Sequence, residues 1–132
     1  FLSFETYTGF WLIFSFGSTT LIVLVFYESE FAQPPNILFG HLLGITIGIL
    51  FNEFLGISFI TLGLSVGCTV TLMMYLKIIH PPAAANPLIA LFADVSLNYI
   101  IFPVLVGSIL IIILSVFINK IILNRPYPKR WY

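Results

Sequence analysis

Lys77-Ile78-Ile79-His80-Pro81-Pro82-Ala83-Ala84-Ala85-Asn86 is the stretch that decides the fold. A helix that reaches Ile79 cannot pass smoothly through the two prolines, because a proline lacks an N–H donor and pushes the preceding residue out of the α-helical region. The three alanines restore strong helix propensity, and proline suits the first turn of a new helix. The sequence therefore predicts helix, break and helix, with the break near His80.

The composition of the whole chain is that of a membrane protein. Of its 132 residues 60% are hydrophobic and 8% are charged, and the mean hydropathy is +1.12, whereas a soluble domain has about a quarter of its residues charged. We therefore expect an integral membrane protein surrounded by a lipid bilayer. A net charge of zero gives a nucleic-acid partner no electrostatic basis, and a single cysteine, Cys68, excludes a disulfide framework and a cysteine-based metal cluster.

The apolar runs predict an all-α fold of about four transmembrane helices, because about 20 helical residues cross the hydrocarbon core. The expected spans are residues 8–27, 37–54, 57–79 and 99–118. Residues 83–92, at ~1.5 Å per residue, fall well short of a core of about 30 Å and predict a half-helix or a re-entrant element. The sequence leaves open whether 8–27 and 82–94 cross the membrane or re-enter it.

Two further features concern the second span and the tail. Gly40, Gly44 and Gly48 recur every fourth residue, so they share one helix face and permit close packing; Asn36 is positioned to cap this helix. The tail 120–132 is basic and aromatic and holds four of the five Lys and Arg residues. The positive-inside rule therefore places the C-terminus on the cytoplasmic side, or its organellar equivalent, of a bacterial inner membrane or an organellar membrane.

An internal repeat is predicted by a shift of 67 residues, which places Gly40 on Gly107 and Asn52 on Asn119 without a gap. Repeats with broken helices in corresponding positions indicate a transporter site. We expect one transmembrane domain with halves of about 1–55 and 56–119, parallel if the short helices re-enter and inverted if they cross. The first residue is not methionine, and both this and the alignment predict a further N-terminal element.

Five groups of residues, spread over nearly the whole chain, carry a resemblance to a known family. They are His80-Pro81-Pro82-Ala83, Phe16-Gly17-Ser18 with Leu21-Ile22, Ala32-Gln33-Pro34-Pro35-Asn36 with Gly40-His41, Pro103-Val104-Leu105, and Asn119 with Arg125-Pro126-Tyr127-Pro128. In this order they resemble the HPP family of integral membrane proteins. The resemblance implies a small helical protein of four spans with a transport role, and plastid and cyanobacterial members are associated with nitrite. This chain departs from the family at two places. It has Ala84 where the family usually has Gly, and Asn86-Pro87 where the family usually has small residues or Thr.

The predicted function is a transporter or channel for a small inorganic anion such as nitrite. A helix N-terminus carries about half a positive charge and free N–H groups, so two half-helices opening at residues 17–20 and 82–84 would cradle the anion. His80, with an ordinary pKa near 6.5, would couple its passage to a proton. The predicted substrate-binding residues are Gly17, Ser18, Thr19, Thr20, Asn36, His41, Lys77, His80, Pro81, Pro82, Ala83 and Asn86, with Gln33 as a further amide donor.

Structural roles compete with this hypothesis at each position. His80 also suits a cap on the last carbonyls of the third helix. His41 suits a buried interhelical hydrogen bond, and Lys77 suits a snorkelling interfacial lysine. The alternative function is an accessory structural subunit of a larger membrane complex, and a homo-oligomer is also considered. An enzyme, a metal and a cofactor are not expected, because the histidines and carboxylates form no metal-binding spacing and no nucleophile has a neighbouring base.

Overall fold

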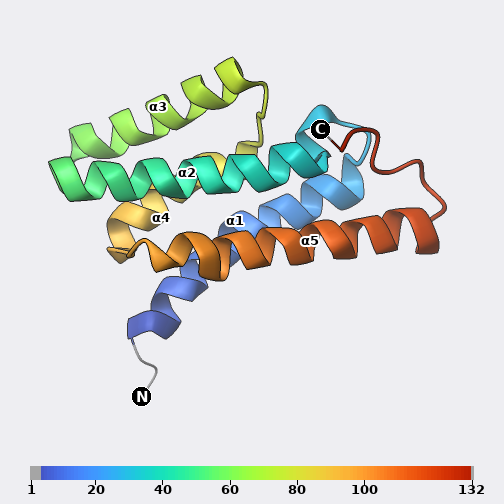
Figure 1. Cartoon of the computed structure of the whole chain (residues 1–132), viewed down its shortest axis with the longest axis horizontal. Helices are drawn as coiled ribbons and strands as arrows, with labels where there is room; N and C mark the ends of the chain where they lie inside the picture. The colour runs from blue at the N-terminus through green and yellow to red at the C-terminus, as the bar shows by residue number, and fades with distance from the viewer. Residues whose placement is uncertain (1–3, 132) are drawn as a thin grey trace.

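The computed structural model describes residues 4–131, with side chains from Leu12 onward. Over that range the chain is helical and contains no strand (Figure 1). The helices are α1 (Phe4–Val25), α2 (Pro34–Leu55), α3 (Phe59–Leu76), α4 (Asn86–Ala93) and α5 (Val106–Val116). Turns of 3-10 helix precede α2 (η1, Glu30–Ala32) and α4 (η2, Pro81–Ala85), and π-helical turns flank α5 (η3, Ile100–Leu105, and η4, Phe117–Ile122).

Three of these helical segments are long and apolar enough to cross a membrane. They are α2, α3 and the segment Ile100–Ile122 that contains α5. Two shorter apolar segments, Leu12–Val25 and Pro81–Ala93, accompany them, and α4 with η2 is the short half-helix that the prolines predict. The predicted all-α membrane fold is therefore confirmed.

Gly40, Gly44 and Gly48, which we call the glycine seam, allow η2 and α4 to pack closely against α2. A Cβ added at Gly44 would lie 2.5 Å from the carbonyl oxygen of Ala83, and one at Gly48 would lie 2.6 Å from Cα of Pro87. Glycine is needed here because backbone occupies the place of its missing side chain. The close packing predicted for Gly40, Gly44 and Gly48 is thus what the structure has.

Residues 80–94 follow α2 in the same direction for most of its length. Near the start of α2, a Cβ at Gly40 would meet that of His80 at 2.8 Å. Near its end, Asn52 Nδ2 donates a hydrogen bond of 2.6 Å to Asp94 Oδ1. This arrangement favours the crossing alternative for the half-helix over the re-entrant one, because the segment ends beside the far end of a spanning helix.

The first and last helices run opposite to α2 and alongside each other. Val23, near the end of α1, packs with Ile37, near the start of α2. Asn119 Nδ2 donates to the Val23 carbonyl at 3.0 Å, and Gly107 packs on the Phe16 ring. In Figure 1, α1 and α5 run in the same general direction and cross obliquely, while α2 and α3 form a neighbouring antiparallel pair.

Two predictions about local structure are wrong. α1 runs without interruption through residues 15–20, because serine, threonine and a single glycine all keep their backbone N–H groups and can continue a helix, unlike proline. α2 begins at Pro34 and not at Ile37, so Asn36 lies inside its first turn and is not the cap. Prolines at the first two helical positions suffice to start this helix.

The predicted repeat stays a prediction, to which the helix bounds add an observation. A shift of 67 residues carries α2, Pro34–Leu55, onto residues 101–122, and the last helical segment is Ile100–Ile122. The two segments run in opposite directions, as they do in an inverted repeat.

Candidate functional site

Two buried histidines share one threonine hydroxyl at the centre of the candidate site. Thr19 Oγ1 of α1 lies 2.9 Å from Nε2 of His41 on α2 and 2.9 Å from Nε2 of His80, just before η2. All three residues are 0% exposed. The His-Pro-Pro break therefore meets α1 and α2 at a single oxygen atom.

Asn86, the first residue of α4, extends this contact to a second hydroxyl. Its Oδ1 accepts a hydrogen bond of 2.9 Å from Ser15, and its Nδ2 lies 3.0 Å from Nδ1 of His41 and 3.1 Å from the His41 carbonyl oxygen. Ser15 Oγ is also 2.9 Å from the Pro82 carbonyl. We call Ser15, Thr19, His41, His80 and Asn86 the polar network.

The hydrogen-bond partners of each imidazole indicate which of its two ring nitrogens carries the proton. His80 Nδ1 lies 2.8 Å from the Phe31 carbonyl oxygen, which can only accept, so His80 carries its proton on Nδ1. Asn86 Nδ2 must face the His41 carbonyl as a donor, so it also donates to His41 Nδ1, and His41 carries its proton on Nε2. His41 then donates to Thr19, and Thr19 donates to His80.

The chain holds His80 in place through the chemistry of the break. Lys77 ends α3 in the left-handed conformation, with φ of 58°. His80 is extended, with φ of −139° and ψ of 97°, as a residue before proline prefers. Its carbonyl then accepts from Ala83 N at 3.0 Å to begin η2. These turns place the imidazole against α1 and η1, and not against the end of α3.

The sequence of nearly the whole chain matches a known protein family. The family model described as "HPP, transmembrane region" matches residues 2–128. The chain belongs to the HPP family. Two proteins of Dictyostelium discoideum, each named as a transmembrane protein, are both 27% identical over 129 residues, which is 92% of this chain and 45% and 42% of their lengths. The HPP chain described here thus spans less than half of those relatives.

No solved structure matches the chain. The motif His80-Pro81-Pro82 supplies the imidazole of His80 and the carbonyl of Pro82 to the polar network. The family match therefore supports an integral membrane protein, and the geometry adds where its motif lies.

Several predicted site residues come together in this HPP protein. Thr19, His41, His80 and Asn86 belong to the polar network, Pro82 contributes its carbonyl, and Ala83 is buried against the glycine seam. Asn36 lies one layer away: its Nδ2 donates to the Ile79 carbonyl at 2.8 Å and its Oδ1 accepts from Arg130 at 2.7 Å.

Other predicted residues lie outside the network. Gly17, Ser18, Thr20, Lys77 and Pro81 are exposed. Because α1 is continuous, residues 17–20 present no helix N-terminus, and the Thr20 hydroxyl donates to the Phe16 carbonyl at 2.9 Å. The prediction of an anion cradled by two opposed half-helices is wrong for this reason.

The competing structural roles also have outcomes. His80 does not cap α3, since its partners are Thr19 and Phe31. His41 does make the buried interhelical hydrogen bonds expected of a structural histidine, and these same bonds join it to His80.

Ser15 and the Phe31 carbonyl were missed among the predicted site residues. Ser15 stands four residues before Thr19, a spacing that places both on one helix face, so this signal was present in the sequence. The Phe31 carbonyl carries no signal in the sequence, because any residue has a carbonyl and its place depends on the turn η1.

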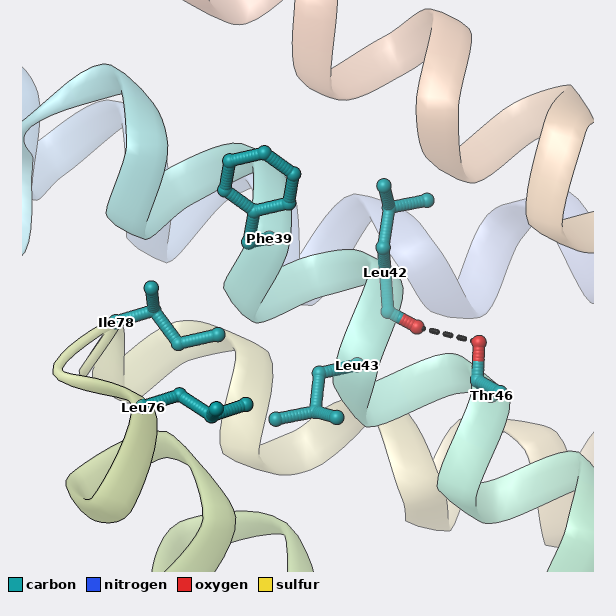
Figure 2. Close-up of a pocket in the computed structure, with 6 residues that line it drawn as sticks. All are labelled: Phe39, Leu42, Leu43, Thr46, Leu76 and Ile78. Carbon is teal, nitrogen blue, oxygen red and sulfur yellow. Dashed lines mark hydrogen bonds between the residues drawn. The ribbon is translucent and has the colours of Figure 1, made fainter. Parts of the chain in front are cut away.

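An open apolar groove of about 450 Å³ lies between α2 and the end of α3. Figure 2 shows the residues that line it, which are Phe39, Leu42, Leu43, Thr46, Leu76 and Ile78. Its polar side chain, Thr46, donates to the Leu42 carbonyl at 2.7 Å. An anion would find no free donor among these lining side chains. We therefore do not assign this groove to transport.

A cleft of about 510 Å³ between α1 and the half-helix borders the polar network. It is lined by Phe14, Ser15, Ser18, Pro81, Pro82, Ala85, Leu88, Ile89 and Phe92. Ser15 belongs to both the cleft and the network, so a solute in the cleft would meet a network hydroxyl. Within residues 12–131, His, Cys, Asp and Glu side chains form no group of three that could hold a metal ion.

Proposed function

We propose that this HPP protein transports a small monovalent anion such as nitrite together with a proton, through the polar network. The observation that carries the proposal is the convergence of Ser15, Thr19, His41, His80 and Asn86, all at most 3% exposed, where α1 meets α2 and the half-helix. Polar and ionisable side chains inside a membrane are costly and commonly mark solute or proton pathways. A chain with 8% charged residues has concentrated both its histidines there.

The cleft beside Ser15 supports an entry route. An anion needs hydrogen-bond donors to replace its water, and Ser15 and Ser18 bring hydroxyls to this cleft. In the structure, the Ser15 hydroxyl donates either to Asn86 Oδ1 or to the Pro82 carbonyl, and not to the cleft. Passage therefore requires α1 and the half-helix to separate at Ser15, which would expose the histidines behind it.

Flux measurements on the full chain in proteoliposomes test this proposal. We expect nitrite uptake that is faster with an inward proton gradient, and a loss of about tenfold or more in the His80→Ala variant, because the proton carrier is gone. Thr20→Val is the matched control, since Thr20 faces outward one residue from the network and should leave flux near the wild-type rate. Folded wild-type protein that carries no nitrite, with or without a pH gradient, would overturn the proposal.

An accessory subunit of a larger membrane complex is the second candidate, and one observation favours it. A Cβ added at Gly63 or Gly67 of α3 would meet no atom of the described residues within 4 Å, so this helix offers a small-residue face on which another helix could approach closely. This function predicts copurification with larger membrane proteins from the native membrane. Gly67→Leu would then lower copurification, and the purified chain alone would carry no nitrite, whereas the transport proposal predicts flux from the purified chain alone.

A further inference from the structure

We infer that the polar network binds one proton, that His80 and not His41 takes it, and that the Thr19 hydroxyl makes this selection by turning between two acceptors. The inference deepens the proposed function and rests on it for its role in transport. The hydrogen-bond geometry that carries it is independent of which anion moves.

Among the residues that the structure describes, His41 has no acceptor for a second proton. Its Nδ1 lies 3.0 Å from Asn86 Nδ2, and that amide cannot be turned, because Nδ2 also donates to the His41 carbonyl and Oδ1 accepts from Ser15. A proton on His41 Nδ1 would set an N–H group against an N–H group. The neighbours of His41 therefore stabilise its neutral form.

His80 does have an acceptor, through a rotation of one hydroxyl. Thr19 Oγ1 lies 3.0 Å from the Ser15 carbonyl oxygen as well as 2.9 Å from His80 Nε2. When His80 Nε2 gains a proton, it can donate to Thr19 Oγ1 while the Thr19 proton turns to the Ser15 carbonyl. A hydroxyl oxygen has one donor and two acceptor positions, so Thr19 then accepts from both imidazoles and donates once.

In this step, His80 binds one proton and the network gains one positive charge. His80 keeps Nδ1–H on the Phe31 carbonyl in both states, and His41 keeps Nε2–H on Thr19. Every polar atom of the shared hydroxyl and the two rings has a partner before and after. One added charge matches one monovalent anion, so we expect one proton to accompany each anion.

The groups that face His80 come from three elements. α1 contributes Thr19, α2 contributes His41, and η1 contributes the Phe31 carbonyl. Glu30, beside Phe31, and Lys77 are exposed. Arg130 lies farther away and bonds to Asn36, whose amide in turn bonds the carbonyl of Ile79. In the described part of the chain, the ionisable ring that faces His80 is thus His41.

Nitrogen-15 NMR of labelled histidine in the full chain, held in lipid nanodiscs, tests the inference directly. From about pH 8 to about pH 3, a range that extends below the ordinary histidine value, we expect one ring to take up a proton first, while the other stays neutral with its proton on Nε2. The titrating signal should vanish in His80→Gln. Titration of His41 first, of both rings, or of neither would overturn the inference.

Thr19 variants test the selection. Thr19→Val is expected to weaken proton binding at His80 about tenfold, because the charged ring loses a hydrogen-bond acceptor, whereas Thr19→Ser keeps the hydroxyl and should titrate as the wild type does. Thr20→Val is the control for a lost hydroxyl on the outer face. If Thr19→Val fails to fold, the wild-type and Thr19→Ser spectra still decide which ring titrates.

The two proposals fail separately. Nitrite flux without selective titration of His80 would sink the inference and leave the transport proposal standing. Selective titration of His80 in a chain that carries no nitrite would do the opposite.

Discussion

At the scale of single residues, Asn86 holds the polar network together, because its amide joins the Ser15 hydroxyl to both the ring and the carbonyl of His41. It is 0% exposed. Its amide also fixes which nitrogen of His41 holds the proton. Asn86 is therefore the residue whose loss should disturb both stability and the histidine chemistry.

We expect Asn86→Ala to lower the free energy of unfolding by about 2 kcal/mol, since it leaves His41 Nδ1 without its donor in the protein interior. Denaturant unfolding in detergent micelles would measure this change. Asn98→Ala, at an exposed joint residue, is the control and should match the wild type. Equal stability of all three proteins would show that the network contributes little to folding.

Tyr127 predicts a pH dependence. Its hydroxyl donates to the Ala32 carbonyl at 2.8 Å, and burial raises the pKa of this phenol above its ordinary range. The fold thus favours the neutral phenol, so its contribution is complete below the unfolded pKa near 10 and is lost as the pH rises beyond that value.

Thermal unfolding of wild type and Tyr127→Phe at about pH 8 and about pH 11 tests this dependence. At the lower pH the variant should be less stable by about 1 kcal/mol, the value of one hydrogen bond, and at the higher pH the difference should shrink or reverse. Tyr75→Phe, at an exposed position, is the control. A difference that does not vary with pH would contradict the prediction.

The residue types of the site were predictable, and their pairing was not. A histidine in an apolar segment is costly unless it faces protein or a cavity, which is why His41 and His80 stood out. Thr19 and Thr20 are adjacent residues of similar type in a helix that is apolar on most sides. Which of them faces inward depends on how α1 packs, and local sequence does not record that.

At the scale of elements, α2 positions the half-helix through close contact between the two backbones at the glycine seam. A Cβ at Gly44 would come within 2.5 Å of the Ala83 carbonyl oxygen and 3.1 Å of Asn86 Cβ. Since the nearest atom belongs to the backbone of η2, the whole turn would have to move. The glycine seam therefore positions the network.

Gly44→Ala is expected to cost about 1–3 kcal/mol of stability, as overpacking commonly does, and to lower nitrite flux by displacing Asn86. Gly67→Ala is the matched variant in α3, where nothing lies within 4 Å of the added Cβ; it should be neutral, or stabilising by up to about 1 kcal/mol through helix propensity. Unfolding and flux should be measured on both. Identical behaviour of the two variants would refute the role given to the seam.

Proline chemistry explains why one break was predicted correctly and the other was not. Pro81 and Pro82 lack N–H groups, so a helix break at His80 followed from covalent structure. Residues 15–20 have no such restriction, and the Thr19 and Thr20 hydroxyls lie within hydrogen-bond distance of the carbonyls of Ser15 and Phe16, four residues earlier in the same helix. A polar cluster in an apolar helix is therefore a sign of packing or of a site, and not of a break.

The five Lys and Arg residues gather at one end of the whole molecule. Lys77 follows α3 at the end where Asn36 bonds Ile79, and Arg130 bonds the same Asn36. Arg125 and Lys129 lie in the tail near the end of α1. Lys120 lies in the last turn of η4, next to Asn119, which bonds the carbonyl of Val23. Glu53 and Asp94 lie near the opposite end of α2. The positive-inside rule expects such a clustering of Lys and Arg side chains if five segments cross the membrane, namely α1, α2, α3, the half-helix and Ile100–Ile122.

Cysteine labelling tests this topology in a Cys68→Ser background. Glu53→Cys and Lys129→Cys should react with an impermeant reagent from opposite sides of the membrane, with Lys129→Cys reacting from the cytoplasmic or equivalent side. Lys77→Cys should react from the same side as Lys129→Cys. Labelling of Glu53→Cys and Lys129→Cys from the same side would rule out five crossings and restore the re-entrant alternative.

The tail has a consequence for the order in which the protein is made. Gln33 Oε1 accepts a hydrogen bond of 2.8 Å from Lys129 N, and Ala32 accepts from Tyr127, while the neighbouring Phe31 carbonyl holds His80. The turn that orients the histidine is thus fastened by residues that come after all the described helices in the chain. A chain that stops before Tyr127 would keep these helices but would lack the hydrogen bonds that hold the turn beside His80.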